Sequence, residues 1–154
     1  MFTQYSYTLL SGIGDVSFDK LVSFDRALIN AGVGNYNLVK VSSILPPFFK
    51  IRKSINVNHG EVLFTAYATL SDIGTGNISS AIGIGVPKDE ANIGVIMEYS
   101  CYDTEANARE YVTRMVTSAM EARKIAIQEI LLASSGVTLS PDGYSTVFAG
   151  VALW

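Results

Sequence analysis

The stretch NYNLVKVSSILPPFFK, residues 35 to 50, contains two adjacent serines followed closely by two adjacent prolines. Leucine, valine and isoleucine recur through it, and we predict a buried strand over residues 35 to 45. The strand must end at the prolines, because proline has no N–H to donate to a neighbouring strand. Ser42 and Ser43 therefore lie close to a strand end, and the simplest interpretation is that the strand stops there.

The serine pair also permits a reaction of the backbone with itself. A serine hydroxyl can attack the carbonyl of the preceding residue where the backbone is held out of its relaxed geometry. Attack by Ser43 on Ser42 gives an ester, and elimination from that ester ends one chain at Ser42 and leaves dehydroalanine. Dehydroalanine hydrolyses to a pyruvoyl group with loss of ammonia. Because Ser-Ser is a common dipeptide, the pair alone does not decide between a strand end and a cleavage site.

The composition limits the classes of partner. Of the 154 residues, 49% are hydrophobic and only 16% are charged, against about 25% charged in an average domain. We expect subunit interfaces to cover part of this apolar surface, although burial within one subunit is the alternative. The net charge of −3 argues against nucleic acid. The chain lacks an apolar run of about 18 residues and a secretory signal at its start, so we expect a cytoplasmic protein without a membrane partner.

Cys101 and His59 are the single cysteine and the single histidine of the chain. One cysteine allows no disulfide within the chain, and a zinc site of cysteine and histidine would lack ligands, so we expect no metal. A serine-histidine pair would need His59, which lies in the polar stretch SINVNHGE and is more simply a solvated turn residue. Cys101 is interpreted as a small packing residue at a strand end.

Hydrophobic periodicity predicts seven strands and two helices in a single domain, residues 1 to 154. The first strand is expected over residues 2 to 10, closed by the glycines of SGIGD. Helices are expected over residues 17 to 31 and from a cap at Asp103 or Thr104 to about residue 123. The other expected strands cover residues 35 to 45, 61 to 71, 77 to 87, 92 to 101, 128 to 139 and 144 to 153. This order predicts an α+β fold with the helices outside antiparallel sheet.

Each helix is expected to turn one apolar face towards the sheet. The apolar residues at helical spacing in the first helix are Leu21, Phe24, Leu28 and Ile29. Those in the second helix are Ala108, Val112, Met115, Ala119 and Ala122.

Three polar residues in apolar surroundings are candidate site residues. Glu98 follows the apolar run GVIM, and a carboxyl group removed from water would keep its proton and could donate it. Asp25 interrupts the apolar face of the first helix, and Asn37 is expected on the same side of its strand as Ser43. Each also has a simpler interpretation: Glu98 on a wet strand face, Asp25 at the boundary of a helix face, and Asn37 as an ordinary edge residue.

Three segments together resemble the pyruvoyl-dependent arginine decarboxylases found in archaea and some bacteria. They are FDRALINAGVGNYNLVKVSSILPP (24 to 47), AIGIGVPKDEANIGVIMEYS (81 to 100) and FAGVALW (148 to 154). VSSI with Pro-Pro, GxGNxNL upstream and IMEY downstream form a far more specific combination than any single motif. With the helix after residue 103, the resemblance covers nearly the whole chain in order.

The resemblance implies an α+β fold arranged as a four-layer αββα sandwich with antiparallel or mixed sheets and helices on the outside. It implies self-cleavage into residues 1 to 42 and 43 to 154, with Ser43 becoming a covalently bound pyruvoyl cofactor at the start of the larger chain. It also implies a homotrimer with active sites between subunits, with a dimer of trimers as the larger alternative.

The same resemblance implies roles for the candidate residues. Carried over by position, Glu98 resembles the acid near the pyruvoyl carbonyl, Asn37 its hydrogen-bonding partner, and Asp25 the carboxylate that meets the guanidinium of arginine. The implied reaction converts L-arginine to agmatine and carbon dioxide, a step of polyamine biosynthesis, through a Schiff base with the pyruvoyl group. The alternatives are another amino-acid substrate (lysine, ornithine or histidine) or a trimeric binding protein of the same fold that never matures.

Overall fold

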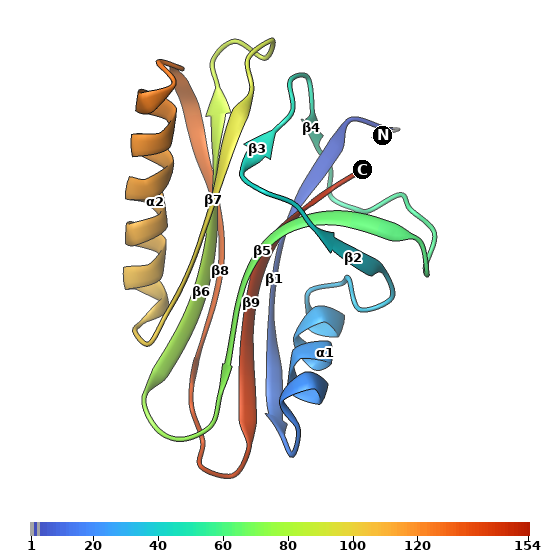
Figure 1. The fold of residues 1–154 in the computed structure, drawn as a ribbon, viewed down its shortest axis with the longest axis vertical. Coiled ribbons are helices and arrows are strands. Elements are labelled where there is room, and N and C mark those ends of the chain that lie inside the picture. Colours follow the sequence, from blue (N-terminus) through green and yellow to red (C-terminus); the bar gives the residue numbers. More distant parts are fainter. Residues whose placement is uncertain (1, 3) are drawn as a thin grey trace.

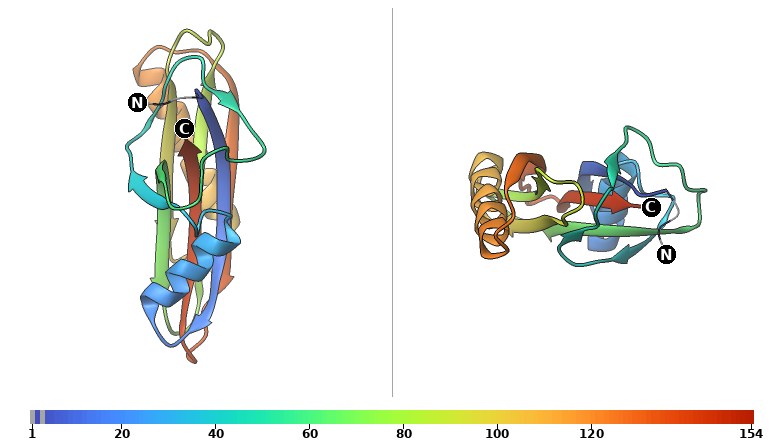
Figure 2. Two further views of the ribbon diagram at one scale, coloured as in Figure 1. Left: turned by 90° about the vertical axis from the view of Figure 1, so that its right-hand side faces the viewer. Right: turned by 90° about the horizontal axis from the view of Figure 1, so that it is seen from above.

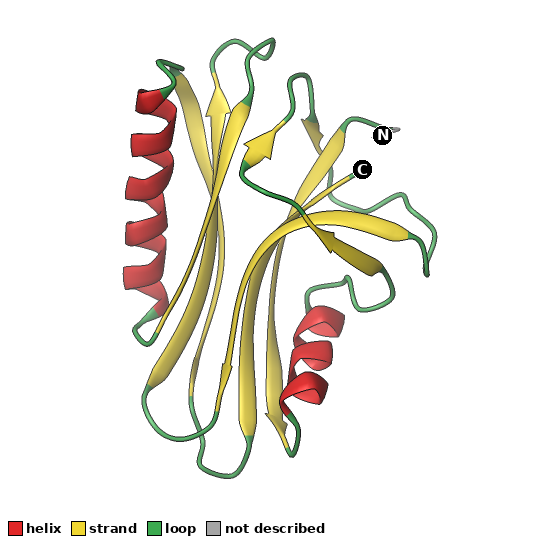
Figure 3. Cartoon of the chain, in the orientation of Figure 1, coloured by secondary structure: helices red, strands yellow, loops and turns green. Residues whose placement is uncertain are grey.

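The computed structural model describes residue 2 and residues 4–154 of the chain, and these residues form nine strands and two helices. Their bounds are β1 (Ser6–Ser17), α1 (Lys20–Asn30), β2 (Asn37–Lys40), β3 (Ile44–Leu45), β4 (Lys50–Ile51), β5 (Val62–Asp72), β6 (Asn77–Pro87), β7 (Gly94–Cys101), α2 (Glu105–Ala122), β8 (Ile127–Thr138) and β9 (Tyr144–Leu153). Figure 3 distinguishes the helices, strands and connecting loops. None of these helices is long and apolar enough to cross a membrane.

The strands form two sheets that stack face to face between the helices. One sheet has the order β2-β5-β9-β1-β4 and the other β3-β7-β6-β8. Helix α1 packs on β1 and β9 of the first sheet, and α2 packs on β6, β7 and β8 of the second. The two helices lie at opposite outer faces, as Figure 1 and the two further views of Figure 2 show. The predicted four-layer αββα sandwich is confirmed.

The main core lies between the sheets, because every second residue of a strand points to the same face. Its buried side chains come from both sheets and include Tyr7, Ala66, Ile82, Ile84, Ile96 and Val151. A smaller core lies between α1 and the first sheet, where Phe148 is fully buried.

The first strand is longer than predicted and continues through the glycines that were expected to close it. β1 pairs with β9 in antiparallel register from Tyr7↔Leu153 to Gly14↔Thr146. A Cβ atom on Gly12 or Gly14 would collide with the backbone of α1. These glycines therefore permit close approach of the helix to the strand, and the prediction that they end the strand is wrong.

Helix α1 begins after Asp19, whose carboxylate accepts hydrogen bonds from the backbone N–H groups of Leu21 and Val22 at 2.9 and 3.1 Å. The predicted apolar face is wrong at two positions, since Leu21 is 72% exposed and Ile29 is 56% exposed. Ser23 and Ala27 are fully buried instead. Small residues face the sheet here because the helix lies so close to β1.

The predicted apolar face of α2 is confirmed, but the residues buried in its second half lie one position later in the chain than predicted. Thr104 caps it by accepting a hydrogen bond from Asn107 N–H at 3.3 Å. Ala122 is exposed, contrary to expectation. The buried residues are Ala108, Val112, Val116 and Met120, four residues apart from one to the next.

Candidate active site

The segment predicted as one strand over residues 35 to 45 is two short strands that belong to different sheets. β2 pairs in parallel with β5, ending at Lys40↔Thr65, whereas β3 pairs antiparallel with β7, starting at Ile44↔Val95. Residues 41 to 43 therefore cross from one sheet to the other, and the crossing can be followed in Figure 1 between β2 and β3. The bond between Ser42 and Ser43 lies within this crossing.

Backbone hydrogen bonds hold both ends of the crossing. Val41 donates its N–H to the carbonyl of Thr65 at 3.1 Å in the first sheet. Ile96 donates its N–H to the carbonyl of Ser43 at 2.7 Å in the second sheet. Ser42, between them, is exposed, and Ser43 is half-buried. The bond expected to break thus lies between two backbone hydrogen bonds, one to each sheet.

A cavity of about 250 Å³ lies at this crossing. Its lining residues are Lys40, Val41, Ser42, Ser43, Ala66, Ile96 and Glu98. The cavity brings together three of the predicted site residues: Ser42 and Ser43 of the cleavage site, and Glu98, which is distant from them in the sequence.

Glu98 lies on β7 opposite Ile82 of β6, a residue of the core between the sheets. Glu98 lines the cavity, and its side chain is 36% exposed, so it does not lie in a dry interior. Its Oε1 atom lies 2.9 Å from Nζ of Lys40. A half-exposed ion pair adds little to stability, and its main effect is to fix where the carboxylate lies.

Lys40 is a site residue that the sequence interpretation missed. It leaves β2 of the first sheet and reaches Glu98 of the second, while its Nζ lies 4.8 Å from the ring centre of Tyr67. The ammonium group is therefore positioned by a carboxylate and by an aromatic face. The available signal is that Lys40 and Glu98 are each the one charged residue of their strand.

Asn37 and Asp25 do not line this cavity within one chain. The Asn37 side-chain amide donates a hydrogen bond to the carbonyl of Gly60 at 2.7 Å. Asp25 lies exposed on α1, and its carboxylate takes part in neither of the two ion pairs found among the described residues. Their expected roles in catalysis and substrate binding remain predictions.

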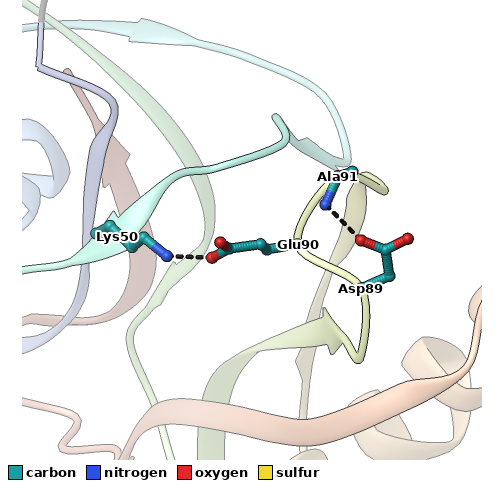
Figure 4. Close-up of polar contacts among 4 residues, drawn as sticks. All are labelled: Lys50, Asp89, Glu90 and Ala91. Carbon is teal, nitrogen blue, oxygen red and sulfur yellow. Dashed lines mark hydrogen bonds and ion pairs between the residues drawn. The ribbon is translucent and has the colours of Figure 1, made fainter.

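The chain after Ser43 is fastened to the loop between β6 and β7 (Figure 4). Phe48 donates its N–H to the carbonyl of Glu90 at 3.0 Å, and Lys50 forms an ion pair with the Glu90 carboxylate. Within the same loop, Asp89 accepts a hydrogen bond from Ala91 N–H at 3.0 Å. If the chain were cleaved after Ser42, these contacts and the pairing of β3 with β7 would hold the new N-terminal segment in place.

Cys101 and His59 lie away from the serine pair. Burial, with the neighbouring charge of Asp103 adding to it, raises the pKa of the Cys101 thiol, which favours the neutral thiol over the nucleophilic thiolate. His59 packs edge-on against Tyr36, with ring centres 5.4 Å apart. Neither residue lines the cavity at Ser43.

Comparison with known proteins gives a consistent match. Residues 6–154 match the family model described as pyruvoyl-dependent arginine decarboxylase. The protein of that name from Methanococcus vannielii is 34% identical over 148 residues, covering 96% of this chain and 88% of the relative. The protein from Methanococcus aeolicus is 36% identical with the same coverage. That from Thermococcus kodakarensis is 38% identical over 122 residues, 78% of this chain and 77% of the relative.

A solved structure of a pyruvoyl-dependent histidine decarboxylase also aligns with 69% of this chain and 52% of its own. The TM-score is 0.48 and the sequence identity 13%, a similarity too low to support the assignment.

Proposed function

This chain belongs to the family of pyruvoyl-dependent arginine decarboxylases, and from that premise we propose that it converts arginine to agmatine and carbon dioxide with a pyruvoyl group made from its own Ser43. The observation that carries the proposal is the position of the Ser42–Ser43 bond. This bond crosses between two sheets, is held by hydrogen bonds to Thr65 and Ile96, and borders the cavity that contains Glu98. A hydroxyl, a restrained backbone and an ionisable acid are thus available in one place.

The residues around Ser43 fit the proposed group. Ser43 supplies the hydroxyl and the carbon skeleton, and the Ile96 N–H already binds its carbonyl. The cavity of about 250 Å³ beside it has room for the substrate's α-carbon and amine. Once formed, the pyruvoyl group supplies a ketone that condenses with the α-amine and accepts the electrons released with carbon dioxide.

We assign to Glu98 the delivery of a proton to the α-carbon after carbon dioxide has left. In this ion pair the proton is on the ammonium, so Nζ of Lys40, 2.9 Å from Oε1 of Glu98, passes a proton to the carboxylate, which then donates it to the α-carbon. The contact of Lys40 with Tyr67 helps to hold this pair in the lining of the cavity. General acid catalysis requires a positioned proton, which such a pair supplies.

Asp25 and Asn37 are assigned to substrate binding and to the pyruvoyl environment across a subunit interface, because one chain does not bring them to its own cavity. The support for an assembly comes from the apolar surface around α1. Phe18 is 89% exposed, and Leu21 and Ile29 of the same region are 72% and 56% exposed. Large apolar side chains exposed along one helix are consistent with a surface that another subunit covers. A homotrimer would cover them and bring Asp25 towards the guanidinium of arginine in the next subunit's cavity.

Denaturing electrophoresis with intact-mass measurement tests the proposal. The purified protein should yield two fragments divided after Ser42. Ser43→Ala should remain a single chain, because it lacks the attacking hydroxyl, while Ser42→Ala is the matched control and should still divide. A single intact chain in the unmodified protein would favour a binding protein that never matures. Division of Ser43→Ala would mean that another group is the nucleophile.

A further inference from the structure

The hydrogen bond from Ile96 to Ser43 binds the carbonyl after the scissile bond, not the carbonyl that the hydroxyl attacks. Its N···O distance is 2.7 Å, at the short end of the usual range for such bonds. The donor is rigid, since Ile96 is 1% exposed and pairs with Ile84 in the middle of the second sheet. A fixed donor on this carbonyl has no evident use in the attack itself.

The elimination step does need such a donor. It removes the proton on Cα of Ser43, and the electrons left on Cα are shared with the carbonyl oxygen of the same residue. We propose that the Ile96 N–H stabilises the negative charge that develops on this oxygen, and so drives the elimination that completes maturation. This inference rests on the proposed function, because it concerns the route by which Ser43 is converted.

Conversion of Ser43 proceeds through ester formation, elimination and hydrolysis. The bond from Ser43 Oγ to the Ser42 carbonyl carbon forms, the peptide C–N bond breaks, and the hydroxyl proton passes to the freed amine. Elimination then breaks the Cβ–Oγ bond, so that Ser42 leaves as a carboxylate that keeps Oγ. The Cα proton passes to solvent water, which reaches the crossing at exposed Ser42, and its electron pair forms the Cα=Cβ bond. Water then replaces the nitrogen, which departs as ammonia.

Water is a weak base, so the acidity of the Cα–H bond decides the rate of elimination. A preorganised N–H aimed at a developing oxyanion is worth a factor of about 100 or more in rate. The donor here belongs to a strand already fixed between β6 and β3, so it needs no rearrangement during the reaction. The carbonyl of residue 43 is neither formed nor broken in any of these steps, so the same donor remains available to the mature protein.

An amide-to-ester replacement tests the inference, because it removes one N–H and keeps the side chain. The hydroxy-acid analogue of isoleucine is introduced at position 96, and glycolic acid at position 94 is the matched control. In the antiparallel register Leu45↔Gly94, position 94 is the next residue of β7 whose N–H faces β3. The control therefore loses a bond of the same ladder without touching residue 43.

The readout is the maturation of the chain rather than its decarboxylase activity. The position-96 ester should mature about 100-fold more slowly and accumulate the Ser42 ester, which hydroxylamine cleaves to release a chain that begins with unmodified Ser43. Mass separates this cleavage from cleavage at the introduced ester. Serine deuterated at Cα should slow the position-96 protein more than the control. Equal slowing of both proteins, or maturation of the position-96 ester at the unmodified rate, would overturn the inference.

Amide hydrogen exchange provides a measurement that does not depend on folding of the ester proteins. In uncleaved Ser43→Ala, the Ile96 N–H should exchange slowly, as a bonded strand amide does, and rapid exchange would refute the donor. If the unmodified chain never divides, the proposed function fails and this inference fails with it. If the chain matures but the ester comparison gives no difference, only this inference fails.

Discussion

Lys40 and Glu98 join the two sheets of the sandwich beside the serine pair, with Nζ and Oε1 2.9 Å apart. Lys40 lies on β2, which precedes the serines, and Glu98 lies on β7, which pairs with the strand that follows them, β3. The ion pair thus spans the same gap as the Ser42–Ser43 bond. This arrangement places a proton source next to the atom that the proposed mechanism makes reactive.

Replacement of Lys40 should therefore affect catalysis more than folding. Lys40→Met leaves Glu98 without its partner, and we expect kcat to fall by roughly tenfold or more, a part of the ~10²–10⁴ that a positioned acid supplies. Lys50→Met is the matched control, because Lys50 also forms a half-exposed ion pair. Steady-state kinetics on fully matured protein measures the effect. Equal kcat values for the two variants would remove Lys40 from the mechanism.

Glu98→Gln separates maturation from decarboxylation. The amide keeps the size of the side chain but cannot deliver the proton, so kcat should fall by roughly 10²–10⁴ while chain division continues. Glu90→Gln, which changes the carboxylate of the other ion pair, should retain its activity. Electrophoresis and carbon dioxide release are measured on the same samples. A Glu98→Gln enzyme with full activity would exclude this residue as the proton donor.

Asp25→Asn should weaken the binding of arginine without affecting chain division. Loss of a charge-assisted pair with the guanidinium should raise KM by roughly 10- to 100-fold. Glu110→Gln changes an exposed carboxylate on the other helix and is expected to leave KM unchanged. If Asp25→Asn lowers the extent of division and the activity in parallel, a structural role replaces the specificity role.

A second link between the sheets predicts a dependence of stability on pH. The Tyr102 hydroxyl donates a hydrogen bond to Asp72 Oδ2 at 2.7 Å, and this bond, followed by the bond from Ile73 N–H, lowers the pKa of the Asp72 carboxyl. A lowered folded-state pKa adds stability above the ordinary pKa of aspartate, and this stability is lost as the pH falls through the folded-state value. Tyr102→Phe should therefore lower the thermal midpoint at neutral pH, and the difference should shrink in acid.

The control for this bond is the same substitution in an Asp72→Asn background. There, Tyr102→Phe should have a smaller effect at neutral pH, and the difference between the backgrounds should disappear in acid. An effect of Tyr102→Phe that is equal in both backgrounds and at all pH values would come from packing rather than from the carboxylate.

Most of the elements could be predicted because their patterns are local. The expected strands at 77 to 87 and 144 to 153 coincide with β6 and β9, since each is an apolar run between turn residues. The crossing at residues 41 to 43 could not be predicted, because periodicity does not say with which strand each half of a segment pairs. The glycines of β1 were misassigned because their function, close contact with α1, is a tertiary property.

The candidate site was predicted in part for a related reason. Ser43 was predicted from the serine pair before the two prolines and Glu98 from its place after an apolar run, and the two residues do line one cavity. Lys40 did not stand out, since a lysine in a strand ordinarily faces solvent and only the fold brings it to Glu98. Asp25 and Asn37 remain predictions whose test requires the assembled protein.

Whether Ser43 becomes a ketone that reacts with arginine can be read from the mass of the larger fragment. Active protein is treated with borohydride, with and without arginine, and the intact mass of the fragment of residues 43 to 154 is measured. Without arginine, the fragment should begin with a keto group that borohydride reduces, with the gain of two hydrogens; with arginine, it should gain a covalent adduct. An active preparation in which the chain is undivided and shows neither the reduction nor the adduct would mean that Ser43 does not form the reactive group.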